Sequence, residues 1–234
     1  GLHLRVRPSG NVKTMMDAKM KGMVMAAMAG LCLVLGIIAT LGGTWLVPVG
    51  DDAEELEDMD ADAGSGLTSQ WSEMEMEDAD TCDATIKMFE EGDMDEDGTE
   101  FECDGAILTM SISYSDLCDA EADDDYEDDC DMATGGMIGT IGMWAGIICA
   151  LMVTLTLVLP MAGVDAMDAV PEMGKTIATW GAGALMLVGM LAWYFMLPET
   201  GSETGLGMSG WLAGAAMSTG LGSALIGQFI EENE

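Results

Sequence analysis

"MIGTIGMWAGIICALMVTLTLVL", residues 137–159, is a stretch of 23 residues without a single charge, and Pro160 follows it. A bilayer core of about 30 Å requires about 20 helical residues to cross it. Three further uncharged stretches have comparable lengths: 22–47, 176–197 and 208–230. Buried helices of a soluble protein are the alternative, but such helices rarely run this far without a charge on any face. The sequence therefore predicts four transmembrane helices, at 20–48, 133–160, 176–197 and 208–230.

The acidic residues are concentrated in one segment. The chain has 234 residues and a net charge of −35, although half of its residues are hydrophobic. Residues 51–131 hold 33 of the 42 Asp and Glu residues and a single base, Lys87. The uncharged stretches argue against a pump or a proton-coupled transporter, because intramembrane charges carry those functions. We therefore expect an all-α membrane protein, a four-transmembrane-helix bundle with a small, disulfide-bonded, partly β extracellular domain between the first two helices.

The lysines and arginines predict the orientation. Five of the seven precede the first apolar stretch, and Lys175 lies between the second and the third. Positive charges near helix ends stay on the cytoplasmic side. We expect a cell-membrane protein with a cytoplasmic tail (1–19), loop (161–175) and C-terminus (231–234), and with residues 50–132 and the loop 198–207 outside. The natural chain is expected to start at Met15, or its first residues to form a disordered tail.

The outer segment divides into a linker and a domain. Residues 49–66 are charged and lack a run of large apolar side chains, so we expect a solvated linker. Residues 67–132 form the acidic domain and include 107–114, where apolar and hydroxyl side chains alternate as in a half-buried strand. This domain also contains Cys82, Cys103, Cys118 and Cys130. Four cysteines outside the membrane predict two disulfides, with the sequential pairing preferred among three possible ones.

Small residues recur at four-residue spacing in two of the apolar stretches. The second stretch has Gly142 and Gly146, and the fourth has Gly210, Gly214, Ser218 and Gly222. Small side chains let helix backbones approach closely in lipid, where no hydrophobic force drives their association. We expect these residues on the packing faces of a tight four-helix bundle; a substrate path is the alternative.

The densest acidic stretch is "GDMDEDGTEFECDG", residues 92–105. Asp93, Asp95 and Asp97 alternate and precede Gly98, which permits the sharp turn that points alternate carboxylates at one centre. This pattern resembles the calcium loop of the EF-hand family and its shorter extracellular relatives. The resemblance implies Ca²⁺ bound by Asp93, Asp95, Asp97, Thr99 and Asp104, with a dissociation constant on the order of 10⁻⁴–10⁻³ M. Random acidity is the alternative, since D-x-D-x-D arises easily in so acidic a segment.

The order of the segments is a span, a large disulfide-bonded outer loop, two spans, a short outer loop and a fourth span. This order resembles the four-span group of the claudins, peripheral myelin proteins and AMPA-receptor regulatory subunits. Gly66, Leu67, Trp71, Cys82 and Cys103 are similar to that group's G-L-W…C…C signature, although Trp71 is not adjacent to Leu67. The resemblance implies a small β-sheet in the first outer loop and a role in adhesion, a paracellular barrier or accessory-subunit binding.

Two classes of function fit these features. The first is a non-enzymatic interaction, adhesion or accessory protein with a calcium-stabilised outer domain. Its partners would be the lipid bilayer and a protein, or another copy of the chain, within the membrane; we expect no nucleic acid. The alternative is a cation channel, or a channel subunit, whose acidic outer loop collects cations. We do not expect an enzyme, because the single histidine, His3, lies in the N-terminal tail and no Ser/His/Asp or Cys/His constellation can form.

Overall fold

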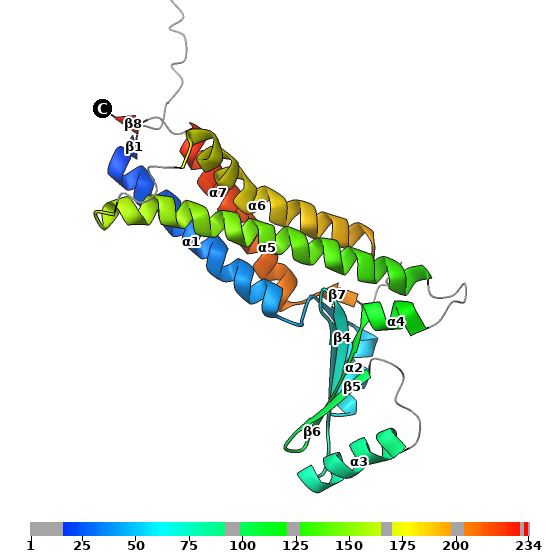
Figure 1. The fold of residues 1–234 in the computed structure, drawn as a ribbon. Helices are drawn as coiled ribbons and strands as arrows, with labels where there is room; N and C mark the ends of the chain where they lie inside the picture. The colour runs from blue at the N-terminus through cyan, green and yellow to red at the C-terminus, as the bar shows by residue number, and fades with distance from the viewer. Residues whose placement is uncertain are drawn as a thin grey trace, which may run out of the picture.

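Four long helices lie side by side and form the body of the protein (Figure 1). The computed structural model describes residues 16–91, 99–120, 127–164, 170–197, 204–229 and 232–233. The four helices are α1 (Ala18–Leu41), α5 (Glu127–Met161), α6 (Glu172–Phe195) and α7 (Met208–Phe229). α5 packs on α1 and α6, and α7 packs on the same two helices. At one end of this bundle two short strands, β1 (Met16–Asp17) and β8 (Glu232–Asn233), pair in parallel.

Three of the four helices are long and apolar enough to cross a membrane. By length and composition, the spans found in the described part of the chain are Lys19–Leu41, Cys130–Met161 and Glu172–Phe195. Their outward faces carry large apolar side chains, such as Leu41, Ile141 and Val188, each of which is more than half exposed. A soluble protein rarely exposes so much contiguous apolar surface. These helices therefore indicate a membrane protein.

α7 completes the bundle but is not among those three candidate spans. Its bounds agree with the predicted stretch 208–230, and its composition is dominated by Gly, Ala, Ser and Thr. Small residues lower the mean hydropathy of a helix while they allow close packing against its neighbours. Membrane-length helices are thus shown for three of the four predicted spans.

Glycines bring the helix backbones together at two places. A Cβ atom on Gly142 of α5 would lie 2.6 Å from the Cα of Gly189 in α6, and Gly146 lies against Met186 of α6. A Cβ atom on Gly220 of α7 would lie 2.9 Å from the Cα of Gly183 in α6. A larger side chain at Gly142 or Gly220 would require a shift of a backbone, so α6 packs directly on both α5 and α7.

The predicted small-residue stripe on α7 lies only partly in the interface. A Cβ atom on Gly214 would be nearest to Met217 of the same helix, at 3.7 Å, and a Cβ on Gly222 would meet only the end of the Met28 side chain. Ser218 is exposed, and its hydroxyl donates to the carbonyl of Gly214. A strict four-residue repeat turns about 40° per step on a helix of 3.6 residues per turn, so it leaves the interface within three steps. The buried residues of α7 are instead Ser209, Gly210, Ala213, Ala216, Gly220, Ser223 and Ala224.

A six-stranded antiparallel sheet stands on the other end of the bundle (Figure 1). In spatial order its strands are β5 (Thr99–Asp104), β6 (Ile107–Ser113), β4 (Ser69–Glu75), β3 (Ala61–Ser65), β2 (Leu46–Pro48) and β7 (Thr204–Leu206). Five strands come from the connection between α1 and α5, and β7 comes from the connection between α6 and α7. β7 pairs with β2 along three residues. The sheet therefore joins the two connections at this end of the bundle.

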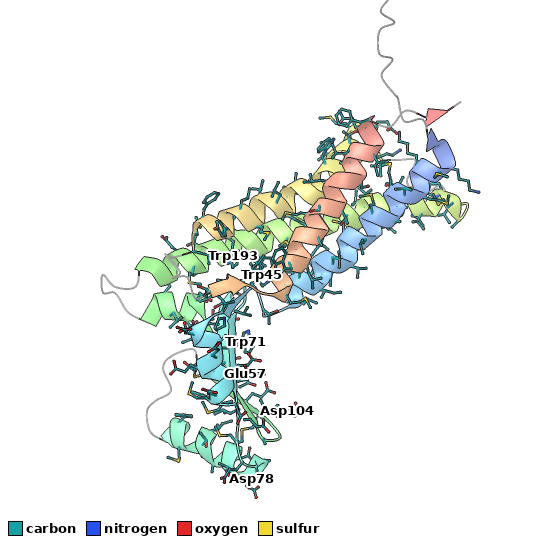
Figure 2. All side chains as sticks on the ribbon, turned by 180° about the vertical axis from the view of Figure 1, so that it is seen from behind. Trp45, Glu57, Trp71, Asp78, Asp104 and Trp193 are labelled. Atoms are coloured by element: carbon teal, nitrogen blue, oxygen red, sulfur yellow. A yellow bond between two sulfur atoms is a disulfide. The ribbon has the colours of Figure 1, made fainter. Side chains whose placement is uncertain are left out.

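Two tryptophans mark the place where the sheet meets the helices. Trp45, which directly precedes β2, is fully buried and lies edge-to-face on Trp193 of α6, with ring centroids 5.2 Å apart (Figure 2). The indole N–H of Trp45 donates to the carbonyl of Ala39 in α1, at 3.0 Å. These contacts join the end of α1 to α6.

A second set of contacts holds the β3–β4 hairpin on the bundle. Leu67, in the turn of this hairpin, is buried and packs on Gly136 and Gly139 of α5. The indole N–H of Trp71 in β4 donates to the carbonyl of Gly43, which follows α1, at 2.9 Å. Because the hairpin packs on α5 and is hydrogen-bonded to the residue that follows the end of α1, the sheet has a defined orientation relative to the helices.

The segment between α1 and β4 differs from the sequence-based expectation. The predicted linker, 49–66, contains α2 (Asp51–Asp58) and β3, and the predicted first span ends early, at Leu41, because residues 46–48 join the sheet. β3 lacks large side chains, but five of its residues pair with β4. A neighbouring strand can thus impose a strand on residues of low intrinsic propensity. The strand predicted at 107–114 is confirmed as β6.

Candidate binding surface on the sheet domain

The predicted calcium ligands are divided between described and undescribed parts of the chain. Asp93, Asp95 and Asp97 lie outside the described residues. Thr99 and Asp104 are the two ends of β5, and they pair with Ile112 and Ile107 of β6. Five steps along an extended strand span roughly 17 Å, whereas ligands of one Ca²⁺ lie 2.3–2.6 Å from the ion. Thr99 and Asp104 therefore do not meet around one ion as the EF-hand pattern implied.

Metal-binding geometry is also absent elsewhere in the described residues: no group of three or more His, Cys, Asp or Glu side chains there could hold a metal ion. The carboxylates of the outer domain are numerous, but they are spread along strands and helices rather than folded around one point.

Two disulfides connect helices to neighbouring elements of the outer domain. Cys82 of α3 (Ala79–Glu91) is bonded to Cys103 of β5, and Cys118 of α4 (Tyr114–Ala120) is bonded to Cys130 of α5. This is the sequential pairing. The first bond fixes α3 against the edge strand of the sheet, and the second fixes the end of the sheet domain to the bundle.

An aspartate stabilises the start of α3. Asp78 directly precedes this helix, and its carboxylate accepts a hydrogen bond from the backbone N–H of Thr81 at 2.8 Å. The bond satisfies one of the amide groups that have no partner within the helix. Hydrogen bonds from the backbone and the side chain of Thr81 hold the pKa of Asp78 below its usual value. Figure 2 shows Asp78 at the part of the domain farthest from the bundle.

One face of the sheet is covered with carboxylates. Successive side chains of a strand alternate between faces, and the acidic residues share one of them. Asp62 lies directly opposite Glu73, and Thr109 lies between Glu73 and Glu102. Like charges opposite each other on neighbouring strands are destabilising, so this face needs water and counterions around it. The full set is Asp62, Glu73, Glu75, Glu100, Glu102 and Asp104.

The opposite face of the same strands is apolar. One row across the sheet runs from Phe101 through Met110 and Ser72 to Ala63, and the next runs from Cys103 through Leu108 and Met74 to Ala61. Leu108 is buried, whereas Met74 and Met110 are 45% and 41% exposed. The apolar face is therefore partly covered and partly open.

A cavity of about 540 Å³ lies over this apolar face. Its floor is made by Met74, Leu108, Met110 and neighbouring residues of the sheet, and Leu56 of α2 lines one side. On the α3 side, Phe89 stacks on Phe101 of β5, with ring centroids 5.0 Å apart and an angle of 14° between the planes. The disulfide at Cys82 holds α3 in this position. The remaining lining residues are Met59, Ala61, Asp62, Ser72, Glu73, Met76, Thr85 and Thr99.

Two further hollows lie nearer the bundle. A cavity of about 330 Å³ adjoins the first, shares Ser72 and Met110 with it, and extends to Val47 and Thr204. A separate cavity of about 400 Å³ at the start of α5 is lined by hydroxyl groups, including those of Thr68, Ser113 and Thr134. Hollows with apolar linings thus lie along the sheet from α3 towards the bundle.

The cavity was not predicted from the sequence. The alternation of Leu108, Met110 and Ile112 indicated one of its strands, and Phe101 and Cys103 show the same period in β5. α3 carries a matching signal, because Cys82, Thr85 and Phe89 recur at helical spacing. The pairing of these faces depends on the strand order and on the position of α3, which no local pattern specifies.

These features define a class of protein: a membrane protein whose helices support a disulfide-bonded sheet domain with an open apolar cavity. No protein-family model and no curated protein matches the chain. Its function is therefore inferred from the geometry of its residues.

Proposed function

We propose that the chain is a non-enzymatic interaction protein of the membrane, in which the helix bundle is the anchor and the sheet domain binds a protein partner. The cavity over the apolar face carries this proposal. It is lined mainly by apolar side chains, and two of the methionines on its floor are nearly half exposed. Open apolar surfaces of this kind mark interaction sites.

The attachment of the sheet to the helices supports a role in presenting the binding surface to a partner protein. Trp45, Leu67 and Trp71 connect the sheet to the ends of α1, α5 and α6, and β7 adds a strand from the second connection. A binding surface that is held in one orientation loses less entropy when a partner docks. This arrangement also agrees with the small β-sheet that the four-span resemblance implies for the first outer loop.

We infer that α7 also crosses the membrane and that the sheet domain lies outside the cell. Lys19, Lys21 and Lys175 lie in the first turns of α1 and α6, at the end of the bundle away from the sheet. Positive charge favours the cytoplasmic side, and disulfides favour the oxidising outer side. Both disulfides lie at or near the sheet. The connections that contain β2 and β7 are separated by α5 and α6, and two crossings keep them on one side, in agreement with their pairing. The pairing of β1, which precedes α1, with β8, which follows α7, supports a crossing by α7.

A cation channel is the competing function. The carboxylate face would suit a cation-collecting vestibule. The close contacts at Gly142 and Gly189, and at Gly183 and Gly220, favour a packed bundle over a pore between these helices. We therefore prefer an interaction protein to a cation channel as the function of this chain.

Site-specific photo-crosslinking in cells that produce the protein tests the proposal. A benzophenone side chain is introduced at Met110, on the cavity floor, or at Thr109, its neighbour on the opposite face of β6. We expect covalent adducts with a partner protein from position 110 and few from position 109. In parallel, the purified protein in liposomes is expected to conduct no cations. Measurable cation flux together with an absence of adducts from position 110 would contradict the proposed function.

A further inference from the structure

We propose that the cavity between α2, α3 and the sheet binds a basic amphipathic segment of the partner protein, whose apolar side chains enter the cavity while its Lys and Arg residues face the surrounding carboxylates. This inference rests on the proposed function and identifies the chemistry of the partner. The volume of the cavity, the types of side chain that line it and the charge of its surroundings each support this inference.

The lining is suited to apolar side chains of irregular shape. Met59, Met74, Met76 and Met110 all contribute to the cavity. Methionine side chains are flexible and polarisable, so a surface that is rich in them adapts to different apolar groups. A volume of about 540 Å³ lies within the range of ligand pockets and admits several side chains. Amphipathic helices commonly dock in grooves of this type, with one apolar face inserted.

The surroundings of the cavity are negative. Asp62 and Glu73 are strand residues of its lining, but their carboxylates belong to the opposite face, so the acidic side chains beside the cavity come mainly from α2. α2, which forms one wall, has the sequence DDAEELED and exposes each of its acidic side chains. Between residues 51 and 131 the sequence contains one base, Lys87, against 33 acids. A partner with positive charges around an apolar stripe is therefore complementary in both respects.

Within the described residues, Lys87 is the one base of the sheet domain, so we assign the complementary positive charge to a partner protein. The described lysines other than Lys87 are Lys19, Lys21 and Lys175, and these lie at the opposite end of the bundle. A second copy of the chain would bring a further net charge of −35. Lipid is a poor occupant, because the cavity lies towards α3, the part of the domain farthest from the bundle (Figure 1). A basic segment of another protein supplies the positive charge that a second copy lacks, and it can reach a cavity that lies away from the lipid.

The test uses the full chain in nanodiscs of zwitterionic lipid, with empty nanodiscs as a blank. The probe is a fluorescent 14-residue helix-forming peptide of Leu and Lys whose leucines share one face; a second peptide of the same composition has its leucines scattered around the helix. We expect saturable binding of the first peptide, and binding of the second that is at least about tenfold weaker. Binding of the first peptide should weaken as salt is raised.

Matched substitutions locate the binding. Met74→Ser and Met110→Ser alter half-exposed floor residues, so the fold should tolerate them, and together they should weaken binding about tenfold or more. Ile107→Ser, on the opposite face of β6, and Met88→Ser, on the outside of α3, should change binding less than about twofold. Hydrogen exchange of β6 verifies that each variant is folded.

The outcomes separate this inference from the function on which it rests. Equal binding of the two peptides, or equal losses from the floor and control substitutions, would show diffuse attraction to carboxylates and overturn the inference. If the peptide fails to bind while position 110 still gives adducts in cells, the partner is not basic and only the inference falls. If position 110 gives no adduct, the proposed function itself fails.

Discussion

Removal of the Cys82–Cys103 disulfide is expected to loosen α3 and β5 while the helix bundle keeps its stability. The bond joins residues separated by 21 positions. Closure of a loop of this length removes about 11 cal/mol/K of entropy from the unfolded chain, which corresponds to about 3 kcal/mol at 25 °C. The bundle does not depend on this bond, because the bond joins α3 to β5, whereas the contact of Gly142 with Gly189 joins α5 to α6.

Hydrogen exchange measures this effect locally, in the full chain and in nanodiscs. In a Cys82→Ser, Cys103→Ser variant, amides of α3 and β5 should exchange about 10²-fold faster, since about 1.4 kcal/mol corresponds to a factor of ten. Amides of α5 and α6 should be unchanged. The matched variant, Cys118→Ser with Cys130→Ser, opens a loop of separation 12, for which the same relation yields about 3 kcal/mol. It should loosen α4 instead.

Two results would refute this reasoning. An increase of less than about threefold in α3 and β5 would mean that Phe89, Phe101 and the strand pairing hold the cavity wall without the bond. An equal increase throughout the bundle would mean that the sheet and the helices unfold as one unit. Either result would show that the disulfide is not the element that positions α3.

Three further predictions concern the bundle, the start of α3 and calcium. Gly142→Ala places a Cβ against the backbone of Gly189, so it should reduce the free energy of unfolding by about 1–3 kcal/mol and lower the melting temperature in detergent. The control, Gly214→Ala, has space for a Cβ and should not lower the melting temperature. Equal effects of the two substitutions would contradict the packing. Because the pKa of Asp78 is lowered in the folded protein, its contribution to stability is present above its unfolded pKa and is lost as pH falls through the folded pKa. The extra hydrogen-exchange protection of α3 in the wild type over Asp78→Ala should therefore disappear on acidification, and a pH-independent difference would oppose the assignment. Calorimetric Ca²⁺ titration should show binding on the order of 10⁻⁴–10⁻³ M that is lost in an Asp93→Ala, Asp97→Ala variant and kept in Asp104→Ala; equal binding by all three proteins would indicate diffuse counterion attraction.

The positions of the helices could be read from the sequence because the requirement for them is local. A helix that faces lipid needs apolar residues along its whole length, so uncharged stretches such as 137–159 locate it within a few residues. The alternation in 107–114 located β6 for a similar reason, since a half-covered strand repeats every two residues. α1 is the exception: it ends at Leu41, because residues 46–48 have a strand partner, β7, more than 150 positions away.

Which face of a helix packs could not be read in the same way. α7 offers small residues on several faces, and the repeat from Gly210 to Gly222 looked continuous in the sequence. The neighbours of α7 select a face that contains Gly220 and Ala224 but excludes Ser218. Close approach of two backbones depends on both helices, so Gly183 in α6 decides the role of Gly220 as much as Gly220 itself does.

The sequence by itself determined where apolar and acidic residues are segregated, and hence the membrane-length helices, the acidic outer domain and its cysteines. Only the tertiary structure decided what that domain offers to a partner. Strand pairing extends β5 so that Thr99 and Asp104 are separated, and it aligns Phe101 with Met110 beneath α3. Composition and periodicity are properties of single segments, whereas a cavity forms from elements that are distant in the chain and become neighbours through folding.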